Sequence, residues 1–598
     1  MLGLLTDPAT QAAAIVRPWA LEPLAPTPTP EQRAWQELEL TLFVHFGMNT
    51  FTDREWGTGK EAPQAFNPTA LDCRQWARAA RAGGFKLMIL TAKHHDGFCL
   101  WPSRFTEHSV KHSPWKNGQG DVVSEFTEAC RAEGLKVGLY LSPWDRHEPS
   151  YGTDAYNTHF TNQLGELLTH YGPVDEVWFD GACGEGPNGK KQVYDWPSYY
   201  ATIRALAPHA VIAIQGPDIR WVGNESGVAR PGESSVQAPR PDVHPGVTNR
   251  IWYPAECDVS IRPGWFYHPR EDTKVKRLDH LLALYLKSVG RNSVLLVNVP
   301  ADPRGRFADP DVQRLGEFGD AVRSLTATNL ALFGQANGTP LRQTSPGDFT
   351  PVQVTDGNPA TYWAAADGAT NAELIVALDK KVPKTFNLLD LREAFWLGER
   401  IERYRLDYEP PEATNTWRTL ARGTVIGARN LVSLPDTTAR RVRLVIEAAR
   451  GCPALSELAL YRTALLPKRN PPPLSSQRPA SASSVHAQGT TFGPDRAVDD
   501  DPDTRWATAD GTRECWLEVD LGAPKHVGRV AIAEFTPRIK EFTIQTRNLP
   551  EETWRETYRG VGVGKDIGFP AVEARFVRLH ILDATDSPTL WEFQVLAP

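Results

Sequence analysis

Residues 174–181 read VDEVWFDG, a short apolar and aromatic run that ends in an acidic residue and a glycine. A continuous apolar run of this length is typical of a strand that is buried on both faces, as in a parallel sheet. Charged side chains are rarely buried without a partner, so Asp180 directly after such a strand calls for an explanation. In parallel barrels the chemistry gathers at the carboxyl ends of the strands, where Asp180 would lie.

Similar runs on both sides of this stretch alternate with segments of helical spacing. Strand-like runs occupy residues 40–47, 85–97, 135–144, 210–216, 257–266 and 292–300. Helical segments occupy residues 70–84, 121–134, 156–172, 198–208 and 275–290. This alternation predicts a parallel sheet covered by helices, and the number of repeats favours a (β/α)8-like barrel over an open sheet.

The barrel is predicted to span residues 40–335, after an N-terminal leader at 1–39 that carries the Pro-rich patch PLAPTPTP and a short helical stretch. Beyond residue 340 the helical spacing fades. Short alternating segments between Gly and Pro turns take its place, and they are typical of β-sandwiches. The chain is therefore predicted to be multidomain.

An internal repeat divides the C-terminal region. DGNPATYW at 356–363 matches DDDPDTRW at 499–506, and the segments that follow each copy also correspond. The repeat predicts two related β-sandwiches, at 340–465 and 485–598. Residues 466–484 between them are polar and rich in Pro, which predicts a stiff linker.

Composition excludes several classes of function. The chain of 598 residues has a net charge of −7, which gives no support to nucleic-acid or anionic-membrane binding. No apolar run reaches the roughly 18 residues of a membrane-spanning helix. Asp7 and the lack of a basic start argue against a signal peptide, so the sequence is compatible with a cytoplasmic protein or with an exported one whose signal was removed. Seven scattered cysteines predict neither a disulfide framework nor a zinc site.

Several other predicted strands also end in functional side chains. They are His45, His94, His95, Tyr140 and Trp265. Together with Asp180 they predict a polar cup with aromatic walls, which is the expected lining of a small-ligand site.

Cleavage of a glycosidic bond needs two carboxyl groups, one of them to protonate the leaving oxygen. Asp180 is the natural nucleophile, because it is fixed at a strand end and Gly181 leaves room for a substrate. The best partner is Glu225 in RWVGNESG, since Gly223 and Gly227 allow a tight turn that can deliver it. The alternatives are a helix N-cap or loop ion pair for Asp180 and an ordinary exposed loop residue for Glu225.

The adjacent pair His94–His95 has three interpretations: sugar binding, a structural role, or a metal site. Neighbouring residues on a strand point to opposite faces, which disfavours a shared metal ion. At a strand end, where the pairing loosens, both side chains could instead bind sugar hydroxyls.

Seven motifs in this order resemble glycoside hydrolase family 29, the α-L-fucosidases. They are LFVHFGMNTF, EWGTG, TAKHHDGF, SPWDRHEPSYG, EVWFDGA, GNESG and DVSIRPGWFYH. The resemblance spans residues 38–325 and is strongest to subfamily B, which favours α-1,3- and α-1,4-linked fucose on branched glycans. It implies a retaining mechanism on a (β/α)8-like barrel, and substrates such as 3-fucosyllactose and Lewis-type glycans.

The resemblance also implies roles for individual residues. Asp180 would be the nucleophile and Glu225 the general acid/base. The fucose subsite would comprise His45, His94, His95 and Tyr140, with Trp265 as its apolar wall; Glu55 and Trp56 in EWGTG match a nearby segment. No cofactor or metal is expected for catalysis.

The two sandwiches resemble galactose-binding-like or discoidin modules, which often hold a structural calcium ion. Its candidate ligands are Asp499, Asp501, Thr504 and Glu592, and the alternative is a capped turn without metal. For the whole protein, two other functions stay open. One is a fucosidase of broader linkage or a related α-L-sugar hydrolase, and the other is a catalytically inactive glycan-binding protein.

Overall fold

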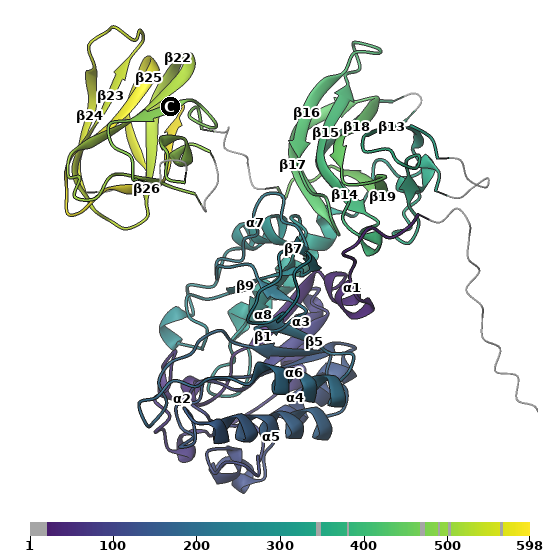
Figure 1. Ribbon diagram of the computed structural model, residues 1–598, viewed down its shortest axis with the longest axis vertical. Coiled ribbons are helices and arrows are strands. Elements are labelled where there is room, and N and C mark those ends of the chain that lie inside the picture. The colour runs from purple at the N-terminus through teal and green to yellow at the C-terminus, as the bar shows by residue number, and fades with distance from the viewer. Residues whose placement is uncertain are drawn as a thin grey trace, which may run out of the picture. The chain divides into compact units, whose positions relative to one another are not determined.

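The computed structural model describes residues 21–342, 349–379, 382–466, 473–487, 491–499, 504–562 and 566–598. These residues form two compact units (Figure 1), one up to Pro467 and one from Lys468 onward. The first unit holds a barrel and a β-sandwich, and the second unit is another β-sandwich.

Eight parallel strands form the barrel. They are β1 (Leu40–Val44), β2 (Leu87–Lys93), β3 (Lys136–Leu141), β4 (Glu176–Phe179), β5 (Val211–Ile214), β6 (Arg220–Trp221), β9 (Ala255–Ser260) and β10 (Val294–Asn298). The sheet runs in the order β5-β4-β3-β2-β1-β10-β9-β6, and a single bridge between Gln215 and Arg220 links its two ends. The barrel is therefore nearly closed, as predicted.

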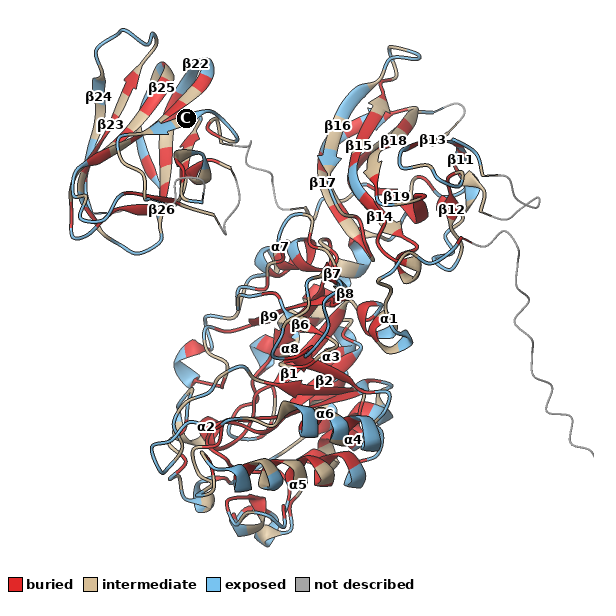
Figure 2. Cartoon of the chain, viewed as in Figure 1, coloured by how far each residue is buried: buried red, intermediate tan, exposed pale blue. Residues whose placement is uncertain are grey.

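Helices surround the barrel strands and also occur in the loops at their ends. They are α1 (Pro30–Gln36), α2 (Met48–Thr52), α3 (Cys73–Ala82), α4 (Val122–Ala132), α5 (Asp154–His170), α6 (Trp196–Leu206), α7 (Leu278–Ser288) and α8 (Asp309–Leu325), with short 3-10 helices η1 (Pro63–Ala65), η2 (Val110–His112), η3 (Trp115–Gly118) and η4 (Pro269–Glu271). Figure 2 shows the strands buried and the helices exposed on one face, which is the pattern that amphipathic spacing predicts.

The barrel departs from regular alternation in one region. Residues 215–219, all described, connect β5 to β6 without a helix. Residues 222–254 then lead to β9 through a long loop and a two-stranded ribbon of β7 (Val236–Gln237) and β8 (Ile251–Trp252). This loop carries Glu225, and without a helix in this region it has room to reach the carboxyl end of the barrel.

The first sandwich packs two antiparallel sheets face to face. Its strands are β11 (Gln335–Thr339), β12 (Trp363–Ala364), β13 (Ala372–Ala377), β14 (Lys384–Glu393), β15 (Ile401–Glu409), β16 (Arg418–Gly423), β17 (Asn430–Ala439), β18 (Arg441–Ala449) and β19 (Ala454–Tyr461), with η5 (Pro351–Val354) and η6 (Phe395–Leu397). One sheet has the order β11-β13-β18-β15-β16 and the other β12-β19-β14-β17. Strand β11 lies ahead of residue 340, where the sequence places the start of this sandwich.

The first sandwich is fixed to the barrel by a buried charge network. Arg429 on the sandwich donates to Glu39 at 2.8 Å and to Asp390 at 2.7 Å. Burial alone would raise the pKa of Glu39, but Arg429 and Arg392 together lower it. Since Glu39 directly precedes β1, the sandwich lies at the amino end of the barrel strands.

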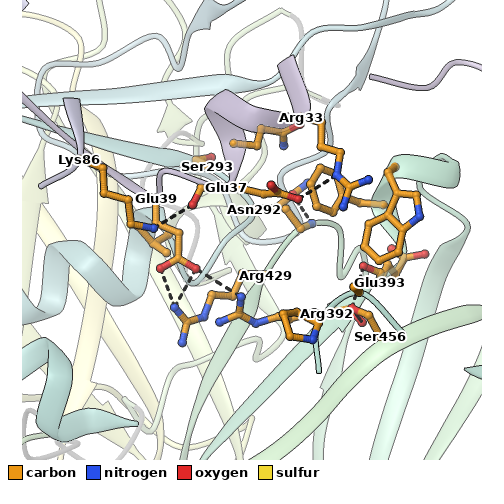
Figure 3. A pocket seen from close by; sticks show the side chains of 17 residues that line it. Arg33, Glu37, Glu39, Lys86, Asn292, Ser293, Arg392, Glu393, Arg429 and Ser456 are labelled. Carbon is orange, nitrogen blue, oxygen red and sulfur yellow. Dashed lines mark hydrogen bonds and ion pairs between the residues drawn. The ribbon is translucent and has the colours of Figure 1, made fainter. Parts of the chain in front are cut away.

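A cleft of about 400 Å³ runs along this junction, and Figure 3 shows the charged side chains that line it. Arg33 pairs with Glu37 at 2.8 Å, and Lys86 donates to the backbone oxygen of Glu37. These side chains bind groups of the protein itself, so we interpret the cleft as part of the contact between barrel and sandwich. It lies at the amino end of the barrel strands, opposite to the predicted site.

The second sandwich has the strands β20 (Ala480–Ala482), β21 (Trp506–Ala507), β22 (Cys515–Glu534), β23 (Ile539–Arg547), β24 (Arg555–Val561), β25 (Ile567–Ala584) and β26 (Thr589–Leu596), with η7 (Pro494–Ala497). Strand β20 pairs with β22 although it lies within the predicted linker 466–484, of which residues 467–472 are outside the described residues. The internal repeat has a structural counterpart. Trp363 and Trp506 are fully buried in their own sandwiches, and each begins a short strand that pairs with the last one.

Two further sequence expectations concern the membrane and the cysteines. In the described part of the chain, no helix combines the length and the apolar character needed to cross a bilayer. All seven cysteines are free thiols.

Candidate active site

A cavity of about 370 Å³ lies at the carboxyl ends of the barrel strands. Asp180 enters it from the end of β4, and Glu225 enters it from the loop after β6. The other predicted residues that line it are His45, Glu55, Trp56, His94, His95 and Trp265. The fold thus brings together side chains that are up to 220 positions apart in the sequence, such as His45 and Trp265.

Asp180 is held by two hydrogen bonds. The Tyr140 hydroxyl donates to its Oδ2 at 3.1 Å, and the Ala182 backbone N–H donates to its Oδ1 at 2.7 Å. Tyr140 itself is fully buried, so it supports the Asp180 carboxyl from behind instead of lining the cavity. A Cβ at Gly181 would lie 2.7 Å from Gln215 Nε2, so a larger residue there would require the Gln215 side chain to move.

The three histidines of the cavity are neutral near pH 7. Burial lowers the pKa of His45 to about 3, and it also lowers the pKa of both His94 and His95. His45 Nδ1 lies 2.8 Å from Asn298 Oδ1, and the amide nitrogen of Asn298 donates to Ser260 and to the Trp265 carbonyl. Asn298 therefore accepts from the Nδ1–H of His45, which leaves Nε2 as an acceptor.

The Nε2 atom of His95 is a hydrogen-bond acceptor, whereas the Nε2 atom of His94 is a donor. The Ser142 hydroxyl donates to the Trp144 carbonyl, so it accepts from His95 Nδ1–H at 2.8 Å and leaves His95 Nε2 as an acceptor. Asn49 donates to His94 Nδ1 at 3.4 Å, so His94 Nε2 carries the proton and can donate. Strand β2 ends at Lys93, and both rings lie beyond it in the same cavity. An acceptor beside a donor suits the hydroxyl groups of a sugar.

Glu55 organises the turn that carries Trp265. Its carboxylate accepts the backbone N–H of Trp265 at 2.8 Å and that of Phe266 at 3.2 Å, and it lies 2.6 Å from His268 Nε2. The indole N–H of Trp265 in turn donates to Glu225 Oε2 at 3.3 Å. Glu55 therefore places an aromatic wall that touches the second carboxyl.

Trp56 forms the rim of the cavity. Its side chain is 57% exposed, and its ring meets those of Trp144 and His95 edge to face at 5.7 and 6.0 Å between centroids. An exposed indole beside a sugar-sized cavity offers a stacking surface for a second ring of the substrate.

The segment that follows β3 has a structural role. Asp145 is buried and pairs with Lys93 at 2.9 Å, and its other oxygen accepts the backbone N–H of His147. Arg146 and His147 bind the backbone carbonyls of Gly57 and Gly59. These contacts brace the loop that carries Trp56, so this turn shapes the rim of the cavity.

Sequence reasoning missed several lining residues. They are Phe43, Trp178, Ile214, Gln215, Trp221 and Asp258. Gln215 directly follows the apolar run of β5, so the strand-end rule could have found it. Asp258 lies inside β9, where only the alternation of faces along the strand shows that it points into the barrel.

Two carboxyl groups across one cavity at the carboxyl end of a parallel barrel, with neutral histidines and aromatic walls, define a glycoside hydrolase site. The family model for alpha-L-fucosidase matches residues 31–324, and the model for the F5/8 type C domain matches residues 339–458 and 479–593. Alpha-L-fucosidase 1 of Arabidopsis thaliana is 41% identical over 452 residues, which cover 73% of this chain and 88% of that protein. The chain belongs to the alpha-L-fucosidase family.

Solved structures agree with this assignment. A GH29 fucosidase of Ruminococcus gnavus, solved in complex with fucose, is 32% identical with a TM-score of 0.69, over 75% of this chain and 97% of that one. A glycoside hydrolase 29 family member from an unknown rumen bacterium is 31% identical with a TM-score of 0.65, over 96% of this chain and all of that one. The predicted α-L-fucosidase family and discoidin-type C-terminal domains are thereby confirmed.

Proposed function

We propose that this α-L-fucosidase is a retaining, exo-acting enzyme that removes α-1,3- and α-1,4-linked fucose from branched oligosaccharides such as 3-fucosyllactose and Lewis-type glycans. The observation that carries the proposal is that Asp180 and Glu225, which come from separate segments, line one cavity. Retention requires two carboxyl groups on opposite sides of the anomeric carbon, one as nucleophile and one as acid/base.

In the first step an oxygen of Asp180 attacks the anomeric carbon of fucose. The bond to the leaving oxygen breaks as Glu225 gives that oxygen its proton, so an ester forms between Asp180 and the sugar. The donors Tyr140 and Ala182 hold the attacking carboxylate in one orientation. Such fixed alignment lowers the entropy cost of reaching the transition state.

In the second step Glu225, now a carboxylate, takes a proton from water. The resulting hydroxide attacks the anomeric carbon, the ester bond to Asp180 breaks, and fucose leaves with its original configuration. Both inversions occur at the same carbon, which is why the net result is retention.

The walls of the cavity suit a 6-deoxy sugar. His45 and His95 offer acceptors and His94 offers a donor for the ring hydroxyls. Trp265 lines the cavity and offers apolar surface for the methyl group. Phe266 is fully buried and packs edge to face on His45 at 5.3 Å between ring centroids, so it supports this wall without lining the cavity. A sugar with a 6-hydroxyl would place a polar group against this surface without a partner.

The linkage preference is tested by digesting a panel of α-1,2, α-1,3, α-1,4 and α-1,6 fucosyl oligosaccharides and identifying the released sugar. We expect rapid release from the α-1,3 and α-1,4 substrates and slow release from the others and from simple aryl fucosides. A preference for α-1,2 fucose would overturn the linkage proposal while leaving the family assignment intact.

Treatment with EDTA is expected to leave kcat unchanged, because the proposed steps use only two carboxyl groups and water. The predicted structural calcium is a separate matter. Thr504 donates to the Asp499 carboxylate at 2.8 Å, and Asp501 lies outside the described residues. If calcium binds there, EDTA lowers the unfolding temperature of the second sandwich, measured by calorimetry, without changing kcat. Loss of activity that calcium or zinc restores would contradict the metal-free mechanism.

A further inference from the structure

Three carboxyl groups in the barrel interior each accept a hydrogen bond from a tryptophan. The Trp35 indole donates to Glu176 at 2.9 Å and the Trp178 indole donates to Glu256 at 2.8 Å. The third pair stands at the cavity, where the Trp221 indole donates to Asp258 Oδ1 at 2.6 Å. The proposed mechanism uses none of these three acids.

The surroundings of Asp258 favour the neutral form of its carboxyl group. Its side chain is 95% buried, and burial together with the nearby Glu256 carboxyl raises its pKa well above the usual range. The hydrogen bond from Trp221 favours the ionised form but does not outweigh these two effects. Asp258 thus accepts from Trp221 at 2.6 Å in surroundings that disfavour a second negative charge beside Glu225.

Trp221 is the last residue of β6 before the loop that carries Glu225. The backbone of this region is tied to β9, because Arg220 N–H donates to Pro254 O and Val222 N–H donates to Glu256 O. The chain then leaves the sheet at Gly223, whose φ of +104° only glycine adopts readily. Trp221 is 38% exposed, and its bond to Asp258 anchors a side chain that lies two residues ahead of Gly223.

We propose that Asp258 is a positioning residue, whose carboxyl group fixes the Trp221 indole and thereby sets the path of the loop that delivers Glu225. The inference rests on the proposed acid/base role of Glu225. It predicts that breaking the Asp258–Trp221 bond weakens proton transfer to the leaving group more than it weakens the attack by Asp180.

The test separates these two effects by the leaving group. A 2,4-dinitrophenyl fucoside needs no acid to leave, whereas 3-fucosyllactose does. Trp221→Phe keeps an aromatic ring but removes the N–H, and Asp258→Ala removes the acceptor. For both variants we expect kcat/KM to fall about 10- to 30-fold on 3-fucosyllactose and less than about 3-fold on the dinitrophenyl fucoside.

Three controls make the result specific. Asp258→Asn keeps a neutral acceptor and is expected to restore nearly normal kinetics. The double variant Trp221→Phe/Asp258→Ala is expected to be no worse than the poorer single variant, because both break one bond. Trp417 is a half-buried residue directly before β16 in the first sandwich, so Trp417→Phe makes the same chemical change away from the cavity and is expected to leave kcat/KM on both substrates unchanged. Trp221 is partly exposed, so its variant keeps the test open if Asp258→Ala does not fold.

The outcomes distinguish the inference from the function on which it rests. Glu225→Ala should lose more kcat/KM on 3-fucosyllactose than on the dinitrophenyl fucoside. If it does and neither Trp221→Phe nor Asp258→Ala shows this difference, the positioning role is wrong and the acid role stands. If Glu225→Ala itself loses kcat/KM equally on both substrates, the acid role is wrong. Equal losses on both substrates, additive losses in the double variant, or an Asp258→Asn variant as impaired as Asp258→Ala would also overturn the inference.

Discussion

Replacing Asp180 with Ala is expected to lower kcat by about 10⁴-fold or more on every fucoside, including aryl fucosides with good leaving groups. The reason is that no other described carboxylate takes the place of Asp180 between the donors Tyr140 and Ala182. A better leaving group does not help a variant that has lost the attacking atom. The measurement is steady-state release of fucose by the purified variant, with its unfolding temperature as a check on folding.

Matched variants separate the loss of a nucleophile from a general disturbance. Asp180→Asn keeps the shape of the side chain and is expected to be as inactive as Asp180→Ala. Asp195→Asn changes an acid that caps α6, where it accepts the Ser198 N–H at 3.2 Å, and is expected to leave the rates unchanged. Near-normal turnover by either Asp180 variant would end the assignment of the nucleophile.

The covalent intermediate gives a second measurement on the same residue. A 2-fluoro fucosyl fluoride should esterify the wild-type enzyme. The 2-fluorine slows both formation and hydrolysis of the ester, but the good leaving group keeps formation fast enough for the ester to accumulate. Peptide mass analysis is expected to find the label on Asp180. A label on another residue, or inversion of the product observed by NMR, would contradict the retaining mechanism.

The strands of the barrel could be predicted because their apolar runs are continuous and are buried on both faces. In β1, β2 and β4 every residue is buried, so the sequence pattern and the burial coincide. Strand β6 was missed because it has two residues and carries an exposed Trp221, which gives no apolar run. Its position is set by pairing with β9, a long-range interaction that no local pattern reports.

Some residues of the site could likewise be predicted from the sequence, and others could not. His45, His94, His95 and Asp180 follow strands directly, so the strand-end rule places them together. Asp258 was missed because it lies inside β9 and not at its carboxyl end, where the strand-end rule looks, although all six residues of β9 are buried. The role of Glu55 was also hidden, since it depends on backbone N–H groups about 210 residues away. Such contacts exist only after the barrel closes.

Replacing Glu225 with Ala is expected to affect substrates unequally, unlike the loss of Asp180. On 3-fucosyllactose kcat/KM should fall about 10³-fold, because the leaving sugar oxygen then departs without a proton. On a dinitrophenyl fucoside kcat/KM should change little, whereas kcat should fall because no base activates the water that hydrolyses the ester. The measurement is a pair of Michaelis–Menten curves for the two substrates.

Adding azide to this assay tests the acid/base role of Glu225 directly. It is a small anion that needs no base, so in the space vacated by the Glu225 side chain it can attack the ester on Asp180 and restore kcat on the activated substrate. Attack from the vacated face would yield a fucosyl azide with the configuration of the substrate, which NMR identifies. The Trp265 indole, which donates to Glu225 at 3.3 Å, would then be free to hold the anion, so Trp265→Phe in the same background is expected to weaken the rescue. Failure of azide to accelerate Glu225→Ala, with intact folding and an unaltered wild-type response, would remove Glu225 from the acid/base role.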